Sequence, residues 1–298
     1  MRTLGSTGVT VSALGLGGSH LGLIKEPEEA VRVVHRALDA GITFFDNAWD
    51  YHDGESERRL GRALKGHREK AFVMSKLDGQ TAASAAKQLD ESLQRLRVET
   101  IDLLQVHEVI RAEDPMHVFA PGGAIETYVA AKAAGKIRFI GFTGHKDPSI
   151  HLAMLDAADR AGFTFDTVQM PLNVLDHHFK SFERAVLPRL KAAKIGVLGM
   201  KPLANGKALK SGAVTAQECL RYAMSLGADV TITGCDSIGV LEQALSVALG
   251  FEAMSLSERE QLVMRTIEPA KNGEFEEFKT KTTHDSTIKH PEWLGLSA

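Results

Sequence analysis

The feature that most constrains the fold of this 298-residue chain is a repeated alternation of short, β-rich apolar runs with helical patterns. The first helical stripe, for example, is ended by Gly41 in the manner usual for helix C-termini. Alternation of this kind predicts a parallel sheet, and eight such units predict closure into a (β/α)8 TIM barrel. A doubly wound open sheet is the alternative, but no Gly-x-Gly-x-x-Gly fingerprint supports it. The predicted strands are residues 13–16, 42–45, 71–75, 101–106, 137–142, 165–169, 195–200 and 229–233.

No linker divides the chain, so we predict a single α/β domain with a C-terminal extension. We expect the barrel to occupy residues 1–256 and the extension to occupy residues 257–298, packed on the barrel. The extension has the pattern of one helix followed by a polar stretch that ends Pro291-Glu-Trp-Leu294. Such a tail would either be frayed or fold over the barrel mouth.

Charge and cysteine content limit the classes of partner and compartment. The formal net charge of -3 gives no electrostatic basis for binding nucleic acid or an anionic membrane. Two cysteines, Cys219 and Cys235, cannot form a disulfide framework, and their spacing matches no metal motif. The N-terminus lacks the apolar core of a signal peptide, and no run approaches the roughly 18 apolar residues of a membrane helix. We therefore expect a cytoplasmic protein with reduced thiols and with neither a nucleic-acid nor a membrane partner.

Barrel enzymes place their reacting groups at the C-terminal ends of the strands, so we asked which polar residues follow the apolar runs. Four of them follow adjacent strands and differ in chemistry: an acid, a phenol, an amine and an imidazole. They are Asp46, Tyr51, Lys76 and His107. Further along the chain, the later strands are followed by Thr143, His145, Gln169, Lys201 and the turn from Gly234 to Asp236.

Three stretches around these residues resemble the aldo-keto reductase family. The run Phe45-Asp-Asn-Ala-Trp-Asp-Tyr51, followed by Gly54 to Leu64, is similar to the family signature. Leu103-Leu-Gln-Val-His107 is similar to its second landmark, and the opening from Leu4 to Ser12 to its start. The resemblance extends in order from Leu4 to roughly Phe251. It implies that Asp46, Tyr51, Lys76 and His107 form a catalytic tetrad.

The chemistry of such a tetrad is coherent. Reduction of a carbonyl leaves an alkoxide that must receive a proton, and a tyrosine of pKa about 10 is a poor acid at neutral pH. We expect the Lys76 ammonium to lower the pKa of Tyr51, with Asp46 fixing the lysine. We expect His107 to polarise the substrate oxygen by a hydrogen bond, and Trp49 to line the substrate side of the mouth.

The resemblance also implies a nicotinamide cofactor, whose expected contacts lie on the later strands. By this match Thr143, His145 and Gln169 would hold the carboxamide, and Met200 would cover the nicotinamide ring. Family members mostly use NADP, but the turn from Thr233 to Gly239 has no Lys or Arg, and Asp236 would repel a 2′-phosphate, so NAD is also possible. The remaining expected cofactor contacts are Gly18, Lys201, Leu203, Gly234, Asp236, Glu242 and Gln243.

Two other functions are compatible with the sequence. The first is a Schiff-base, aldolase-type enzyme that uses Lys76 or Lys201; it needs an amine of lowered pKa, whereas Asp46 would keep Lys76 charged. The second is a non-catalytic, nicotinamide-binding regulatory protein. A metal-dependent hydrolase is disfavoured because the 12 histidines include no His-x-His pair, so we predict no metal. We expect a small carbonyl substrate, a substrate wall formed by residues 108–123, and a monomer or weak homo-oligomer.

Overall fold

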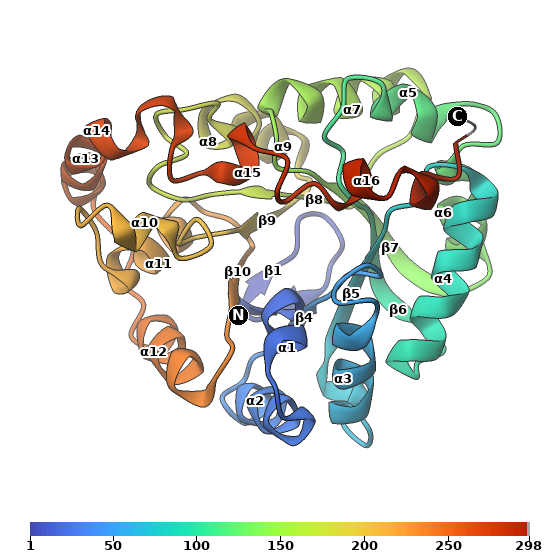
Figure 1. Cartoon of the computed structure of the whole chain (residues 1–298), viewed down its shortest axis with the longest axis horizontal. Coiled ribbons are helices and arrows are strands. Elements are labelled where there is room, and N and C mark those ends of the chain that lie inside the picture. The colour runs from blue at the N-terminus through green and yellow to red at the C-terminus, as the bar shows by residue number, and fades with distance from the viewer. Residues whose placement is uncertain (297–298) are drawn as a thin grey trace.

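A closed barrel of parallel strands forms the centre of the computed structural model, which describes residues 1–296. The order around the barrel follows the chain, and β10 pairs with β3 to close it, as Thr231 opposite Leu14 shows. The predicted (β/α)8 barrel is therefore confirmed (Figure 1). Its strands are β3 (Leu14–Gly17), β4 (Phe44–Asp46), β5 (Phe72–Leu77), β6 (Ile101–Val106), β7 (Ile137–Thr143), β8 (Thr167–Pro171), β9 (Gly196–Met200) and β10 (Val230–Gly234).

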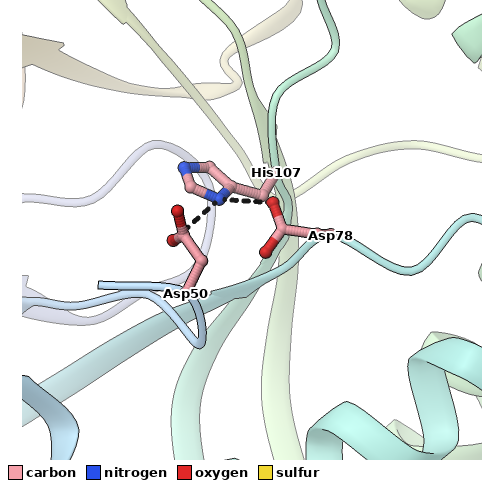
Figure 2. Close-up of side chains that lie close together, drawn as sticks. All are labelled: Asp50, Asp78 and His107. Carbon is pink, nitrogen blue, oxygen red and sulfur yellow. Dashed lines mark hydrogen bonds and ion pairs between the residues drawn. The ribbon is translucent and has the colours of Figure 1, made fainter. Parts of the chain in front are cut away.

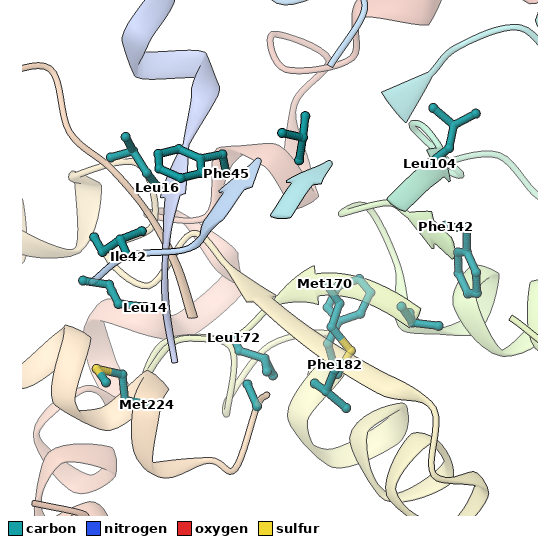
Figure 3. Packing of buried hydrophobic residues seen from close by; sticks show 14 of the residues in the cluster. Leu14, Leu16, Ile42, Phe45, Leu104, Phe142, Met170, Leu172, Phe182 and Met224 are labelled. Atoms are coloured by element: carbon teal, nitrogen blue, oxygen red, sulfur yellow. The ribbon is translucent and has the colours of Figure 1, made fainter. Parts of the chain in front are cut away.

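Helices surround the barrel and bury their apolar faces against it. The larger apolar cluster lies between strands and helices and includes Phe142 of β7 and Phe182 (Figure 3). The helical pattern of residues 182–193 forms two helices, α8 (Phe182–Ala185) and α9 (Leu187–Ala193). The break occurs because Pro188 has no N–H to continue the α8 hydrogen-bond pattern. The surrounding helices are α2 (Pro27–Asp39), α3 (Glu55–Ala63), α4 (Ala82–Leu96), α6 (Ala124–Ala133), α7 (Pro148–Arg160), α8 (Phe182–Ala185), α9 (Leu187–Ala193), α11 (Ala216–Ser225) and α12 (Ile238–Leu249).

A short N-terminal hairpin covers the end of the barrel where the strands begin. It consists of β1 (Arg2–Thr3) and β2 (Thr10–Val11), which pair antiparallel. Its turn lies against the start of β9, because a Cβ added to Gly5 would lie 2.4 Å from the backbone nitrogen of Gly196. Leu4 and Val11 belong to the apolar cluster that fills the barrel interior, together with Phe44, Phe72, Met74, Leu103, Leu198, Val230 and Ile232. The hairpin leaves the opposite end of the barrel, where the strands end, free for a functional site.

The C-terminal segment crosses that opposite end (Figure 1, red). The prediction of a single helix here was wrong, because the segment folds into α13 (Leu256–Arg265), α14 (Ile267–Ala270), α15 (Glu277–Thr280) and α16 (Ser286–Lys289). Two 3-10 turns, Lys271–Gly273 and Pro291–Leu294, complete it. Its last turn reaches α4, where the Leu294 carbonyl accepts hydrogen bonds from the Gln80 amide and the Ser84 hydroxyl. The segment therefore covers part of the mouth.

The remaining elements of the described residues are short: α1 (Gly18–Leu23), a 3-10 turn at Arg68–Lys70, α5 (Asp114–Phe119) and α10 (Lys207–Lys210). None of the described helices is long and apolar enough to cross a membrane. Cys219 and Cys235 are both buried free thiols, as expected, and burial raises the pKa of each to about 12.

Candidate active site

The C-terminal ends of the strands surround a cavity of about 670 Å³. Residues that end or directly follow strands form much of its wall, including Gly17, Asp46, Thr143, Met200 and Gly234. This placement follows from the parallel barrel, in which the C-terminal ends of all eight strands meet at one face. The cavity is the expected location for the side chains predicted to react.

Lys76 connects two other members of the predicted tetrad. It lies in β5, is 1% exposed, and pairs with the carboxylate of Asp46 at the end of β4. Its ammonium also donates to the carbonyl of Asn47 at 2.7 Å and to the hydroxyl of Tyr51 at 3.1 Å. All three ammonium hydrogens are therefore used, and a buried charge with its donors satisfied is held in one place.

The pKa of Tyr51 differs from the expected one. Burial raises the pKa of Tyr51 well above 10, and the charges of Asp46, Asp50, Glu108 and Asp78 raise it further. The prediction that Lys76 lowers this pKa was wrong, because Asp46 neutralises the nearby ammonium while three more carboxylates lie around the ring. Tyr51 is consequently a protonated phenol over the whole physiological range.

His107, directly after β6, faces two carboxylates (Figure 2). Its Nδ1 lies 2.9 Å from an oxygen of Asp78, which follows β5, and 3.5 Å from an oxygen of Asp50, which follows β4. Burial lowers the pKa of His107, but the charges of Asp78 and Asp50 and the hydrogen bond that Asp78 accepts from the ring outweigh burial and raise it to about 8. At neutral pH the imidazole is therefore mostly a cation.

This His107 group also bears on metal binding. Within residues 1–296, Asp50, Asp78 and His107 form the single group of His, Cys, Asp or Glu side chains whose ligand-type atoms all lie within 4.8 Å of one another. Nδ1 of His107 is already hydrogen-bonded to Asp78, so these two side chains have the geometry of a buried ion pair.

Two buried polar atoms, one at the end of β7 and one in the middle of β8, have no partner within the described chain. They are Oγ1 of Thr143 and Oε1 of Gln169, on residues that lie opposite each other in the sheet register. The other end of the Gln169 amide donates to Asp46 at 3.1 Å, so its orientation is fixed. An unpaired buried oxygen is costly to leave without a partner. Thr143 lines the cavity, where its hydroxyl fits an amide ligand such as the predicted nicotinamide carboxamide, whereas Gln169 does not line it.

The wall formed after β9 and β10 carries the other predicted cofactor contacts. Met200, Lys201, Leu203, Gly234 and Asp236 all line the cavity. Burial and the charge of Lys76 lower the pKa of Lys201 to about 8. This wall brings a cation into a largely buried position near the mouth.

His20 was not predicted from the sequence and lies on the same wall. Its ring packs on Gly234, where an added Cβ would lie 2.0 Å from Nδ1 of His20. Burial lowers the pKa of His20, and Lys201 acts in the same direction while Asp236 opposes it.

The structure does not bring every predicted residue to the cavity. Gly18 begins α1 and packs on the carbonyl of Asp46, where an added Cβ would lie 2.4 Å away. On α12, Glu242 pairs with Arg36 at 2.6 Å and Gln243 is exposed. These three residues and Gln169 do not line the cavity, and their contacts with a cofactor stay predictions.

Two other side chains differ from their predicted roles: one is occupied by a tail residue, and the other lies outside the cavity. His145 lines the cavity, but its Nε2 is engaged 3.0 Å from the Asp285 carboxylate of the tail. Trp49 was expected at the substrate side of the mouth, and this was wrong. Its indole N–H donates to Glu91 at 2.7 Å and its ring packs edge-on against Trp293, outside the cavity.

Asp50 and Asp78 were not predicted from the sequence. They follow β4 and β5, the strands that contain Asp46 and Lys76. Applying the strand-end criterion to more than one polar residue per strand would have found both. Glu108 was placed only in the expected substrate wall. It has a left-handed backbone, φ 46°, and its carboxylate accepts from the backbone amides of Ser286 and Thr287, each at 2.8 Å. Through this contact the tail residues Thr283, His284 and Ser286 become part of the cavity wall.

Comparison with known proteins agrees with this architecture. The family model described as "Aldo/keto reductase family" matches residues 13–219. The chain belongs to the aldo/keto reductase family. An L-galactose dehydrogenase of Arabidopsis thaliana is 32% identical over 225 residues, which are 71% of this chain and 68% of that protein. An uncharacterised oxidoreductase of Bacillus subtilis is 30% identical over 237 residues, 71% of this chain and 70% of that protein.

Solved structures of aldo-keto reductases share the fold. The holo form of one from Bacillus halodurans has a TM-score of 0.73 at 23% identity, covering 89% of this chain and 95% of that one. One from Klebsiella pneumoniae in complex with NADPH has a TM-score of 0.72 at 22% identity, covering 90% and 96%. The barrel fold is thus shared with solved aldo-keto reductases.

Proposed function

We propose that this aldo/keto reductase reduces aldehydes or ketones to alcohols with NADPH as the hydride donor and Tyr51 as the general acid. The observation that carries the proposal is the position of Lys76, which binds both Asp46 and the Tyr51 hydroxyl at the cavity wall. Because Lys76 donates to the Tyr51 oxygen, the phenolic hydrogen is left to donate to another acceptor. A carbonyl oxygen in the cavity is the natural one.

The walls of the cavity fit a nicotinamide dinucleotide. Thr143 in the wall offers an unpaired hydroxyl for the carboxamide, with the unpaired oxygen of Gln169 opposite it in the sheet register, and Lys201 offers a cation for phosphate. The cofactor would supply the hydride. Two Klebsiella pneumoniae neighbours are described as complexes with NADPH and with NADP, which favours NADP here, and the absence of Lys or Arg from the turn at residues 233–239 leaves NAD possible.

Polar groups in the cavity wall favour a substrate that carries hydroxyl groups. The wall includes Asp50, His52, Thr283 and Ser286, each with hydrogen-bonding capacity. A hydroxylated carbonyl compound can satisfy such groups, whereas a lipophilic aldehyde would leave them unpaired. Two relatives carry names of this kind, L-galactose dehydrogenase and 6-dehydroglucose reductase, the latter 32% identical over 157 residues. We therefore propose a small sugar-like carbonyl substrate.

The direct test follows oxidation of NADPH and NADH by the purified protein with matched panels of sugar-derived and aliphatic carbonyl compounds. We expect turnover with both cofactors and a higher kcat/KM for hydroxylated substrates. A Lys76→Met variant, which removes the ammonium that holds Tyr51, should lose most turnover. No oxidation of either cofactor with any carbonyl compound would overturn the proposal.

The lowered pKa of Lys201, about 8, is the property that a Schiff-base enzyme would need. This second candidate function predicts that borohydride traps a covalent adduct between a carbonyl substrate and Lys201. Trapping that requires Lys201 but no nicotinamide would favour it over the reductase.

A further inference from the structure

The imidazole of His107 is fixed by groups from two neighbouring strands, β4 and β5, and the segments that follow them. Its backbone amide donates to the carbonyl of Leu77 at 2.9 Å, and its Nδ1 lies 2.9 Å from Asp78 and 3.5 Å from Asp50. Burial raises the pKa of Asp78, while the charge of His107 and its hydrogen bond to the carboxylate oppose that rise. When Asp78 is ionised it can only accept, so Nδ1 carries the hydrogen of this contact. The ring therefore has one defined tautomer or is charged, and it cannot offer Nδ1 to a substrate.

The other ring nitrogen, Nε2, lies on the side of the imidazole away from Asp78 and carries none of the contacts drawn to the two carboxylates (Figure 2). His107 lines the cavity, and its ring packs edge-on against Tyr51 with ring centroids 5.8 Å apart. A carbonyl oxygen that accepts from the Tyr51 hydroxyl therefore lies beside the His107 ring. With Nδ1 protonated, a second proton on the ring must sit on Nε2.

We propose that Asp78, assisted by Asp50, is a positioning residue that holds His107 as an imidazolium with Nε2–H directed at the reacting carbonyl oxygen. This inference rests on the proposed reductase function. It adds to that function an acidic partner for the histidine, two residues beyond Lys76 in the chain. Tyr51 and His107 then offer two donors to one oxygen.

The positive charge of His107 also bears on proton transfer from Tyr51. Hydride from the reduced nicotinamide forms a C–H bond, the carbonyl π pair moves to oxygen, and the Tyr51 O–H bond breaks as the alcohol O–H bond forms. The step leaves a phenolate among Asp46, Asp50, Asp78 and Glu108, which all oppose it. Beside it, the imidazolium adds a second cation to Lys76, and water returns the proton to Tyr51 after the alcohol leaves.

The groups that set the charge of His107 come from every element packed against it. From the segments after β4 and β5 these are Asp50 and Asp78, and from its own segment Glu108. Lys76 in β5 acts on Asp78, and His145 after β7 acts on Glu108. Burial and the charge of Asp78 raise the pKa of Asp50 to about 7, and Ser286 of α16 opposes that rise. Among these, Asp78 makes the shortest contact with the ring, so its removal should change the charge of His107 most.

The experiment compares the pH dependence of carbonyl reduction in the wild type and Asp78→Asn. The wild type should lose kcat/KM above about pH 8, where His107 becomes neutral. In Asp78→Asn this decline should begin at least about one pH unit lower, and kcat at neutral pH should fall on the order of tenfold. Affinity for the cofactor should be unchanged.

Asp102→Asn is the matched control. Asp102 is likewise buried and ion-paired, with Arg68 at 2.7 Å and Arg138 at 2.6 Å, but it lies at the start of β6. It should leave the pH profile in place even if it lowers stability. Equal pH profiles in the wild type and a folded Asp78→Asn would overturn the proposal, because a purely structural role predicts that result.

A second measurement keeps the inference testable whether or not the variant is active. The ring protons of His107, assigned by their loss in His107→Gln, are titrated by NMR with no substrate present. We expect a pKa near 8 in the wild type and a lower pKa in Asp50→Asn. A wild-type ring that is neutral at pH 7 would refute the proposal even if reduction is observed. Loss of reduction on adding EDTA and its return with zinc would refute it too, by placing a cation between the three side chains.

Discussion

Nζ of Lys76 donates a 3.1 Å hydrogen bond to the hydroxyl of Tyr51 while its charge is paired with Asp46. The lysine therefore orients the phenol without acting as a free positive charge beside it. This explains why the pKa of Tyr51 is raised by burial and carboxylates although an ammonium touches the hydroxyl. In this site the charge of Lys76 is shared with Asp46, so a developing phenolate needs a further cation beside it, which the proposed imidazolium of His107 supplies.

The first prediction is that Tyr51→Phe reduces turnover on the order of 10²-fold or more and leaves cofactor binding nearly intact. The substitution removes the hydroxyl that donates to substrate but keeps the ring that packs on His107. Steady-state reduction rates and a cofactor fluorescence titration measure the two effects separately. Wild-type turnover in Tyr51→Phe would show that another group is the acid.

The second prediction is that Asp46→Asn changes the pH dependence of reduction as well as its rate. Asp46 binds Lys76 and accepts from Gln169, so the substitution removes one negative charge from the group around Tyr51. The pKa of Tyr51 should then fall towards its usual value. We expect the loss of activity at high pH that ionisation of Tyr51 causes to move to lower pH. A normal profile with normal activity would contradict the role of Asp46.

Much of the barrel could be predicted because local patterns determine it. Each strand is a short apolar run. Thr215 caps α11 and forms a capping box with Glu218, a pattern that the residue types alone indicate. Lys76 and His107 could be found because a strand end fixes which face of the barrel a residue occupies. The direction of a side chain at that face depends on neighbouring strands, so the contact of Asp78 with His107 could not be predicted.

The C-terminal tail shows the limit of local patterns more clearly. Its α16 begins where Ser286 and Thr287 donate their backbone amides to Glu108, which lies far away in the sequence. A helix of four residues held by such a contact leaves no periodic pattern to detect. For the same reason, the part of the cavity formed by the tail was missed.

The third prediction concerns cofactor choice. Asp236 lines the cavity in a turn without Lys or Arg, so a 2′-phosphate would meet a carboxylate there. We expect the wild type to prefer NADPH over NADH by well below the roughly 10²-fold that a 3 kcal/mol charge contact provides. Asp236→Arg should raise affinity for NADPH and lower it for NADH, as measured by fluorescence titration.

Glu260→Arg is the control for this substitution, because it makes the same change in net charge at an exposed position of α13. It should leave both affinities unchanged. A wild type that binds NADPH several hundredfold more tightly than NADH would refute weak discrimination, and would point to Lys201 or the tail as the source of the charge.

The tail is also anchored by a buried group of three charges. Lys279 is 2% exposed and donates to Asp176 at 2.6 Å, to Glu276 at 2.9 Å and to the carbonyl of Phe179 at 2.8 Å. Burial raises the pKa of Glu276 to about 7, with Asp176 adding to the increase and Lys279 opposing it. Two carboxylates share one ammonium here, so their joint ionisation is unfavourable.

The last prediction follows from this raised pKa. Folded Glu276 binds its proton more tightly than the unfolded chain, in which its pKa is near 4.5, so its contribution to stability is full below about pH 4.5 and is lost as the pH rises through about 7. Each unit of difference corresponds to about 1.4 kcal/mol of unfolding free energy. Glu276→Gln removes this titration and keeps a hydrogen-bonding group beside Lys279 and Asn173. The loss of Tm between pH 5 and pH 8 should therefore be smaller in Glu276→Gln than in the wild type, whereas Glu274→Gln, at an exposed neighbouring position, should behave as the wild type does. Parallel Tm curves for the wild type and Glu276→Gln would mean that Glu276 stays ionised beside Lys279 throughout this range.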